Sequence, residues 1–226
     1  MSKDLKNNIA LFIALLFHTC GIIGILFTPY KNWFIANTPV NLLLMALLLL
    51  WTQPKKKISF FVFLLLAFAT GMGTEILGVN TSRLFGEYHY GDTLGIKYKN
   101  VPLLIGINWF VIVFCAGVIM YKIDNWILKK LGADMHVTGF MQIFSFVVDA
   151  ALLATFFDWV MEPVAAKLGY WQWNGKIPFY NYTCWFFISA ALLTVFHFLK
   201  FNKENQFAVH LFIIQLLFFL ALRIIL

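Results

Sequence analysis

The chain has 226 residues, of which 62% are hydrophobic, 19% aromatic and only 12% charged. Soluble globular domains have about 45–50% apolar and about 25% charged residues, so the composition excludes a water-soluble core, a disordered chain and a disulfide-stapled secreted domain. The net charge of +7 in so apolar a chain favours basic loops beside a membrane, and no nucleic-acid partner is expected.

About seven segments are long and apolar enough to cross the ~30 Å hydrocarbon core of a bilayer. In chain order they are residues 9–27, 33–51, 58–78, 101–121, 139–162, 179–199 and 206–226. We therefore expect an all-α fold, a polytopic membrane helical bundle in which residues 1–226 form a single integral membrane domain.

Lys and Arg are unequally divided between the two ends of this bundle. Ten lie at the N-terminus and in the links after the second, fourth and sixth segments, among them the run Lys55-Lys56-Lys57, and seven lie on the other side. Because basic loops stay in the cytoplasm, we expect the N-terminus inside and the C-terminus outside.

The links after the third and fifth segments repeat one order of residues. The first runs through Glu75, Gly86-x-Tyr88-x-Tyr90, Pro102 and Trp109-Phe110, and the second through Glu162, Gly169-x-Trp171-x-Trp173, Pro178 and Trp185-Phe186. Both links lie on one side, which predicts an internal parallel repeat of helices 3–4 and 5–6, with a substrate site where the halves meet. Aromatic residues are also common at any membrane interface, which is the simpler explanation.

Four acidic residues lie within or at the ends of the segments: Glu75, Asp149, Asp158 and Glu162. Such groups cost ~2.5–3.5 kcal/mol at mid-bilayer and usually face a cavity. Asp158 and Glu162 are four residues apart and share a helix face. Asp149 is about half a turn out of phase and fits an interhelical hydrogen-bond set better. We expect Glu75, Asp158 and Glu162 to converge beneath the aromatic links, although Glu75 and Glu162 also fit solvated helix ends.

The spacing of the other reactive residues excludes several common centres. The chain contains no His-x-x-His, His-x-x-x-His or Cys-x-x-Cys pattern. Its histidines are His18, His89, His136, His197 and His210. A helix-borne zinc or di-iron site, a magnesium-diphosphate site and a phosphate cradle are therefore not expected. The last segment has no lysine for a retinal Schiff base. We expect no metal and no cofactor.

A protonated carboxylic acid in an apolar chamber is a competent general acid. Aromatic faces around it stabilise a developing carbocation. These groups indicate proton-initiated chemistry on an electron-rich alkene of a lipophilic isoprenoid. Capture of the tertiary cation by water is hydration, and capture by a neighbouring double bond is cyclisation.

The set of motifs resembles the integral-membrane carotenoid-biosynthesis family, which includes carotenoid 1,2-hydratases of the γ-carotene 1′-hydroxylase and bisanhydrobacterioruberin hydratase type. Beyond the repeated residues, the resemblance rests on Asp158-x-x-x-Glu162-Pro163 and Pro178-x-x-Asn181, and it covers about helices 3 to 6. The chain departs from the family pattern twice, with Glu162 where Asp is usual before Pro and Cys184 where Gly is usual before Trp185.

The resemblance implies addition of water across the terminal C1′–C2′ double bond of an acyclic carotenoid ψ end group, in a bacterial or archaeal cytoplasmic membrane and without a cofactor. Its partners would be the carotenoid, water and membrane lipid. Asp158 or Glu162 would donate the proton, with Glu75 positioning the water. Asn181 would orient that water or the new hydroxyl. The polyene end would lie among aromatic side chains, namely Tyr88, Tyr90, Trp109, Trp171, Trp173 and Trp185.

Three other functions remain open from the sequence. A membrane lycopene-type cyclase shares the size, the apolar composition and the acid-driven first step. A proton-coupled small-molecule transporter would use Asp149, Asp158 and Glu162 as its relay. A non-catalytic membrane subunit would scaffold other carotenoid enzymes.

Overall fold

The computed structural model describes residues 2–131 and 139–226, so His136 lies outside the described residues. The described residues form eight helices: α1 (Lys3–Phe27), α2 (Lys31–Ala36), α3 (Thr38–Thr52), α4 (Ile58–Thr81), α5 (Leu103–Leu131), α6 (Gly139–Lys167), α7 (Phe179–Phe198) and α8 (Gln206–Ile225). The links contain β1 (Tyr88–Tyr90), the 3-10 turn η1 (Asp92–Leu94), β2 (Lys97–Tyr98), β3 (Val101–Pro102) and β4 (Trp171–Trp173).

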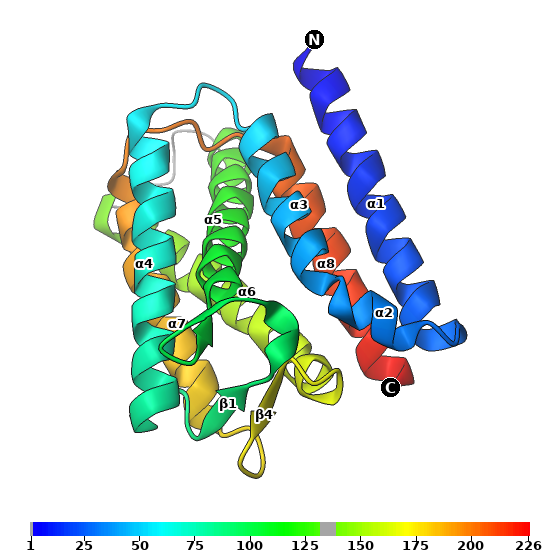
Figure 1. The fold of residues 1–226 in the computed structure, drawn as a ribbon. Helices are drawn as coiled ribbons and strands as arrows, with labels where there is room; N and C mark the ends of the chain where they lie inside the picture. The colour runs from blue at the N-terminus through cyan, green and yellow to red at the C-terminus, as the bar shows by residue number, and fades with distance from the viewer. Residues whose placement is uncertain (1, 132–138) are drawn as a thin grey trace.

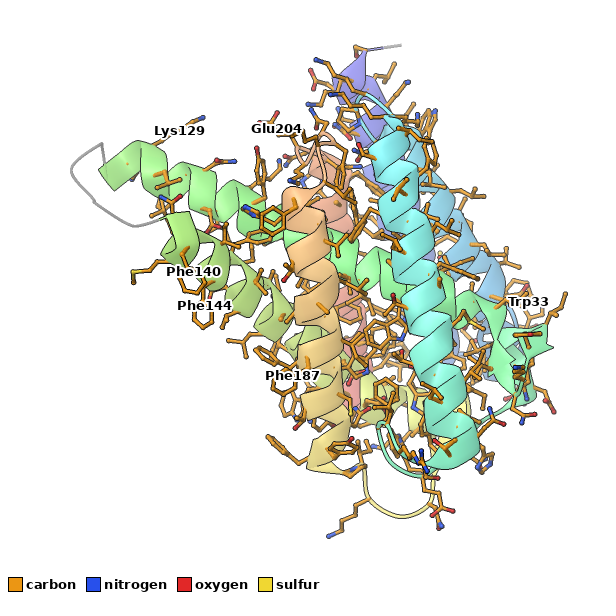
Figure 2. All side chains as sticks on the ribbon, turned by 90° about the vertical axis from the view of Figure 1, so that its left-hand side faces the viewer. Trp33, Lys129, Phe140, Phe144, Phe187 and Glu204 are labelled. Carbon is orange, nitrogen blue, oxygen red and sulfur yellow. The ribbon has the colours of Figure 1, made fainter. Side chains whose placement is uncertain are left out.

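Six of these helices, α1 and α4 to α8, are long and apolar enough to cross a membrane. Their outer faces expose large apolar side chains. Phe140, Phe144 and Phe187 are 77%, 61% and 66% exposed and point away from the bundle (Figure 2). Acyl chains solvate such a surface, whereas water does not. The predicted all-α, multi-pass membrane bundle is confirmed.

The second predicted segment, residues 33–51, is two helices rather than one. α2 and α3 meet at Asn37, whose side-chain amide donates to the carbonyl of Trp33 at 2.8 Å. Pro39, in the first turn of α3, has no N–H to continue the preceding helix. The 15 residues of α3 rise about 22 Å, less than the ~30 Å of hydrocarbon. Together α2 and α3 still return the chain to its N-terminal end, so the two termini lie at opposite ends of the bundle (Figure 1).

α5 is the centre of the bundle. In its most apolar window 72% of the residues are buried, against 28–39% in the other five spans, and it packs against α3, α4, α6, α7 and α8. Where the start of α4 and the end of α7 pack against the first half of α5, aromatic rings lie with centroids 5.1–6.3 Å apart. This phenylalanine cluster consists of Phe60, Phe63, Phe110, Phe114, Phe196 and Phe201. It fills the interior there with apolar side chains.

At the end of the bundle opposite the start of α4, the two repeated links pair with each other. β1 and β4 are antiparallel, with Tyr88 opposite Trp173, His89 opposite Gln172 and Tyr90 opposite Trp171. His89 and Gln172 occupy the same position of the two Gly-x-aromatic-x-aromatic motifs, so the register is symmetric about them. α4 and α6 run in one direction and α5 and α7 in the other (Figure 1). The two halves are therefore related as in a parallel repeat.

Flanking backbone bonds follow the same symmetry. The Gly91 N–H donates to the Tyr170 carbonyl at 2.9 Å, and the Asn174 N–H donates to the Glu87 carbonyl at 3.0 Å. Gly91 corresponds to Asn174 in the repeat, and Glu87 to Tyr170. The glycines that open the motifs both adopt positive φ, +123° at Gly86 and +77° at Gly169, a conformation that favours glycine.

α6 continues past Glu162, where the predicted segment ended, through Pro163. A proline has no N–H, so the carbonyl of Trp159 loses its partner within the helix. Nη1 of Arg223 on α8 donates to that carbonyl at 2.6 Å, and the guanidinium lies 3.8 Å from the centroid of the Trp159 ring. Arg223 thus replaces the missing bond and ties α8 to the helical turn between Asp158 and Glu162.

We expect Arg223→Ala to lower the free energy of unfolding by about 1–2 kcal/mol, because the Trp159 carbonyl loses its donor in a membrane interior. Pro163→Ala restores a backbone donor for this carbonyl. In the double variant it should therefore remove most of the loss caused by Arg223→Ala, so the two changes in unfolding free energy should not be additive. Thermal unfolding in detergent measures both, with Arg223→Lys as the variant that keeps a donor. Fully additive losses would contradict this role for the arginine.

Candidate active site

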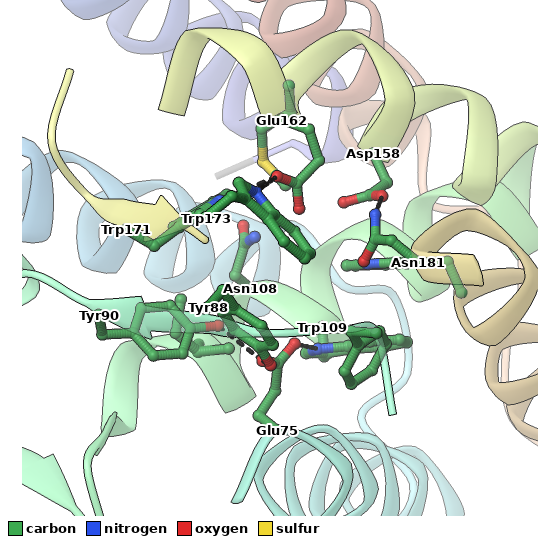
Figure 3. A pocket seen from close by; sticks show the side chains of 14 residues that line it. Glu75, Tyr88, Tyr90, Asn108, Trp109, Asp158, Glu162, Trp171, Trp173 and Asn181 are labelled. Atoms are coloured by element: carbon green, nitrogen blue, oxygen red, sulfur yellow. Dashed lines mark hydrogen bonds between the residues drawn. The ribbon is translucent and has the colours of Figure 1, made fainter. Parts of the chain in front are cut away.

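One cavity at the β1–β4 end of the bundle is lined by all ten residues singled out from the sequence (Figure 3). They are Glu75, Tyr88, Tyr90, Trp109, Asp158, Glu162, Trp171, Trp173, Asn181 and Trp185. The cavity volume is about 20 Å³, which is room for about one water molecule. We call it the acid chamber. Asp158 and Glu162 lie on one side of it and Glu75 on the other (Figure 3).

Glu75, from α4, accepts three hydrogen bonds. The hydroxyl groups of Tyr88 and Tyr90 donate to its Oε2 at 2.5 and 2.7 Å. The indole N–H of Trp109 donates to its Oε1 at 3.0 Å. Burial, and next the charge of Glu75, raise the pKa of Tyr88 and of Tyr90 well above the usual value, so both phenols remain donors at neutral pH. This arrangement suits a carboxylate anion, which only accepts.

Glu162, from α6, is held in the same way by the second half of the repeat. The indole N–H groups of Trp171 and Trp173 donate to its Oε2 at 2.9 and 2.8 Å. Glu75 and Glu162 are only 5% and 4% exposed, so neither is a solvated helix end. In each half, the aromatic residues of the strand therefore bind the glutamate of the preceding helix.

The two repeated tryptophans meet between the halves. The rings of Trp109 and Trp185 are stacked, with centroids 3.7 Å apart and planes within 6° of parallel. Equivalent residues that contact each other mark the place of a two-fold axis. The acid chamber thus lies where the two halves meet.

Asp158 breaks this symmetry. It is 0% exposed, and its Oδ2 accepts from the side-chain amide of Asn181 at 2.9 Å. Its Oδ1 is buried with no hydrogen-bond partner, and it points toward Glu162 on the same side of the chamber (Figure 3). In the first half of the repeat, Gly71 stands at the position of Asp158 and Ile105 at that of Asn181. The acid–amide pair therefore exists in the second half alone.

Four further residues line the chamber that were not among the predicted site residues: Phe85, which belongs to the motif around Tyr88, and Ile105, Asn108 and Met161. Asn108 is the most informative, because it brings an amide between the acids (Figure 3). It is the only amide in residues 101–121 and directly precedes the repeated Trp-Phe, a signal that could have identified it. Ile105 and Met161 stand in apolar runs and give no such signal.

Asp149 does not line the acid chamber. Its Oδ2 accepts from the hydroxyl of Ser145 at 3.0 Å, one turn earlier on α6. This partner lies four positions back on the same helix, so among the described residues the hydrogen bond of Asp149 is within α6 and not between helices.

The chamber contains the parts for proton transfer to an apolar substrate. Asp158 has one oxygen free to carry a proton. The aromatic faces of Tyr88, Trp109 and Trp173 would stabilise a positive charge formed nearby, as would the hydrogen-bonded carboxylates. Such an arrangement is chemically able to protonate a neutral, electron-rich group and to shelter the resulting cation.

Gly71 supplies the space for the stacked tryptophans. A Cβ at this position would lie 2.6 Å from Cβ and Cγ of Trp109, whereas a Cβ at Gly73 would have no neighbour within 4 Å. We expect Gly71→Ala to cost about 1–3 kcal/mol of stability and to loosen the Trp109–Glu75 bond. Gly73→Ala should be neutral or stabilise by up to about 1 kcal/mol. Thermal unfolding of the two variants checks this, and equal effects would contradict it.

Comparison with known proteins gives one match. The sequence model of a family described as carotenoid biosynthesis protein matches residues 36–226, which include every residue of the acid chamber. No curated protein and no solved structure matches the chain significantly.

Proposed function

The chain belongs to the carotenoid biosynthesis protein family, and on that premise we propose that it is a cofactor-independent hydratase. Its reaction adds water across the terminal C1′–C2′ double bond of an acyclic carotenoid ψ end group, giving a tertiary alcohol. The observation that carries this proposal is the unpartnered, fully buried Oδ1 of Asp158. A buried polar atom without a partner is costly unless it has a use, and here it adjoins aromatic walls and room for a water molecule.

In the first step, the carboxyl proton on Asp158 Oδ1 is transferred to C2′ of the alkene. The alkene's π electrons form the new C–H bond and leave a tertiary cation at C1′. The stacked Trp109 and Trp185 and the neighbouring rings face this charge. The Asn181 amide, bonded to Oδ2 at 2.9 Å, holds the acid in position and stabilises the carboxylate that forms.

In the second step, water attacks C1′ and loses a proton. Glu162 is the acceptor, because both indole bonds go to Oε2 and Oε1 is left free. Glu162 is one helical turn from Asp158, so transfer of the proton between them restores the starting state. The balance is alkene plus water to alcohol, with no oxidant or reductant.

Two observations favour hydration over the alternatives. The chamber has space for a water molecule and places the amides of Asn108 and Asn181 beside it, which suits a reaction that consumes water, whereas a cyclase does not use water. The phenylalanine cluster fills the interior beside the first half of α5 with apolar rings, which opposes a proton relay across the membrane.

We expect Asp158→Asn to lower hydration at least about 10²-fold, because the variant has no proton to donate. Asp149→Asn, nine residues earlier on the same helix and outside the chamber, should retain activity. Both variants are compared in a lycopene-producing bacterium, with γ-carotene as a second substrate. The pigments are separated by chromatography, and their masses are measured by mass spectrometry. The wild-type product should gain the mass of one water.

Isotopes separate this reaction from its rivals. In deuterated water the product should carry one non-exchangeable deuterium, and in oxygen-labelled water its hydroxyl oxygen should come from the solvent, with oxygen gas absent and a chelator present. A product that gains deuterium but no oxygen atom identifies a cyclase. Unchanged pigments from both substrates, or full activity of Asp158→Asn, contradict the hydratase.

We further propose that the basic end of the bundle faces the cytoplasm of a bacterial or archaeal cell, which puts the acid chamber near the outer face. Lys56 and Lys176 are exposed in links at opposite ends. In a cysteine-free background, a membrane-impermeant maleimide added to intact cells should modify Lys176→Cys and not Lys56→Cys. The reverse pattern would invert the orientation.

A further inference from the structure

A larger hollow opens on the side of the bundle between α1, α2 and α3. Its volume is about 510 Å³, within the ~300–1,000 Å³ of typical small-molecule sites. Its walls are mostly apolar and include Leu16, Phe17, Ile25, Trp33, Phe34 and Val40. We call it the lipid-side hollow. It belongs to elements that take no part in the acid chamber.

A middle hollow of about 60 Å³ lies between this region and the acid chamber. With the lipid-side hollow it shares Thr38, Asn41 and Phe218. With the acid chamber it shares Ile105, Asn108, Met161 and Trp171. Each hollow is therefore separated from the next only by side chains that line both. Together they mark one path from the lipid to Asp158.

The outer end of the path faces the acyl chains. Trp33 and Val40 are 60% and 59% exposed, Trp33 stands at the edge of the bundle (Figure 2), and Cys20 is exposed as well. A lipid-soluble molecule reaches this opening sideways from the bilayer and never has to enter water. That route matches a substrate that dissolves only in the hydrocarbon.

Two of the side chains between the hollows, Met161 and Phe218, are of kinds that can move aside. Met161 is unbranched, with a flexible thioether that fills irregular gaps, and it is the residue before Glu162. Phe218 packs edge-on against His18, with centroids 5.3 Å apart. Gly21, three residues after His18 on α1, leaves space beside the same ring, since a Cβ there would lie 3.2 Å from it. Small rotations would join the three hollows.

We propose that these hollows form a lateral channel that admits an acyclic carotenoid from the bilayer and holds its polyene while one end group reacts at Asp158. This inference rests on the proposed function and names the path by which that substrate reaches the site. A long, thin, apolar ligand is the occupant that fits, because the acid chamber alone, at about 20 Å³, holds only water. The mostly apolar outer walls do not suit a water file.

Cys20 provides a binding assay that does not depend on turnover. It is the exposed cysteine at the channel mouth, whereas Cys115 and Cys184 are buried. Purified protein in micelles is treated with a small lipophilic maleimide, with and without lycopene, and Cys20→Ser serves as the blank. Lycopene should slow modification of Cys20 about tenfold, since an occupied channel excludes the reagent.

The matched variants are Val40→Trp and Leu47→Trp. Both residues lie on α3 and are 59% and 60% exposed, but only Val40 lines the lipid-side hollow. Val40→Trp should remove the protection of Cys20 and lower kcat/KM about tenfold, mainly through KM, as expected when binding and not chemistry is impaired. Leu47→Trp should behave as the wild type in both measurements.

The outcomes separate the channel from the reaction. Protection of Cys20 that Val40→Trp abolishes supports the channel even where no hydrated product forms, and then the proposed reaction alone fails. Absence of protection in the wild-type protein overturns the channel, whether or not product forms. Equal losses in Val40→Trp and Leu47→Trp also overturn it.

Discussion

Burial of two carboxylates at one end of an apolar bundle is the constraint on which this structure depends. Glu75 and Glu162 lie where neither water nor lipid headgroups satisfy them, so the protein must supply donors. Tyr88 and Tyr90 donate to the first, and Trp171 and Trp173 to the second. These donors lie on the two strands that pair with each other. The strand pair, the converging helices and the chamber between them therefore form one cooperative unit.

Symmetry explains the scaffold, and its violation explains the chemistry. The pairing of β1 with β4 is symmetric about the equivalent residues His89 and Gln172, and the equivalent tryptophans stack at 3.7 Å. Where the first half has Gly71, which makes room for Trp109, the second has Asp158. One half thus contributes packing where the other contributes an acid, and the reacting groups gather on one side of the chamber.

The composition and the apolar runs were sufficient to predict the membrane bundle. The repeat, the shared face of Asp158 and Glu162 and the family resemblance predicted ten of the fourteen residues that line one cavity. Other features depend on contacts between distant segments. The pairing of β1 with β4, the choice of donors for each glutamate and the bond from Arg223 to the Trp159 carbonyl have no local signal. The break at Asn37 was missed because residues 33–51 are apolar on average, although Asn37 and Pro39 interrupt the apolar run.

A single Asp158 has a further consequence for a linear substrate with two chemically identical termini. Under the proposed reaction the molecule presents one terminus at a time, while the other remains among the lipid tails. To modify both, it has to withdraw, reverse and enter again. The one-sided product is then a free species that other membrane proteins can capture, and the ratio of one-sided to two-sided pigment depends on how quickly the chain is released.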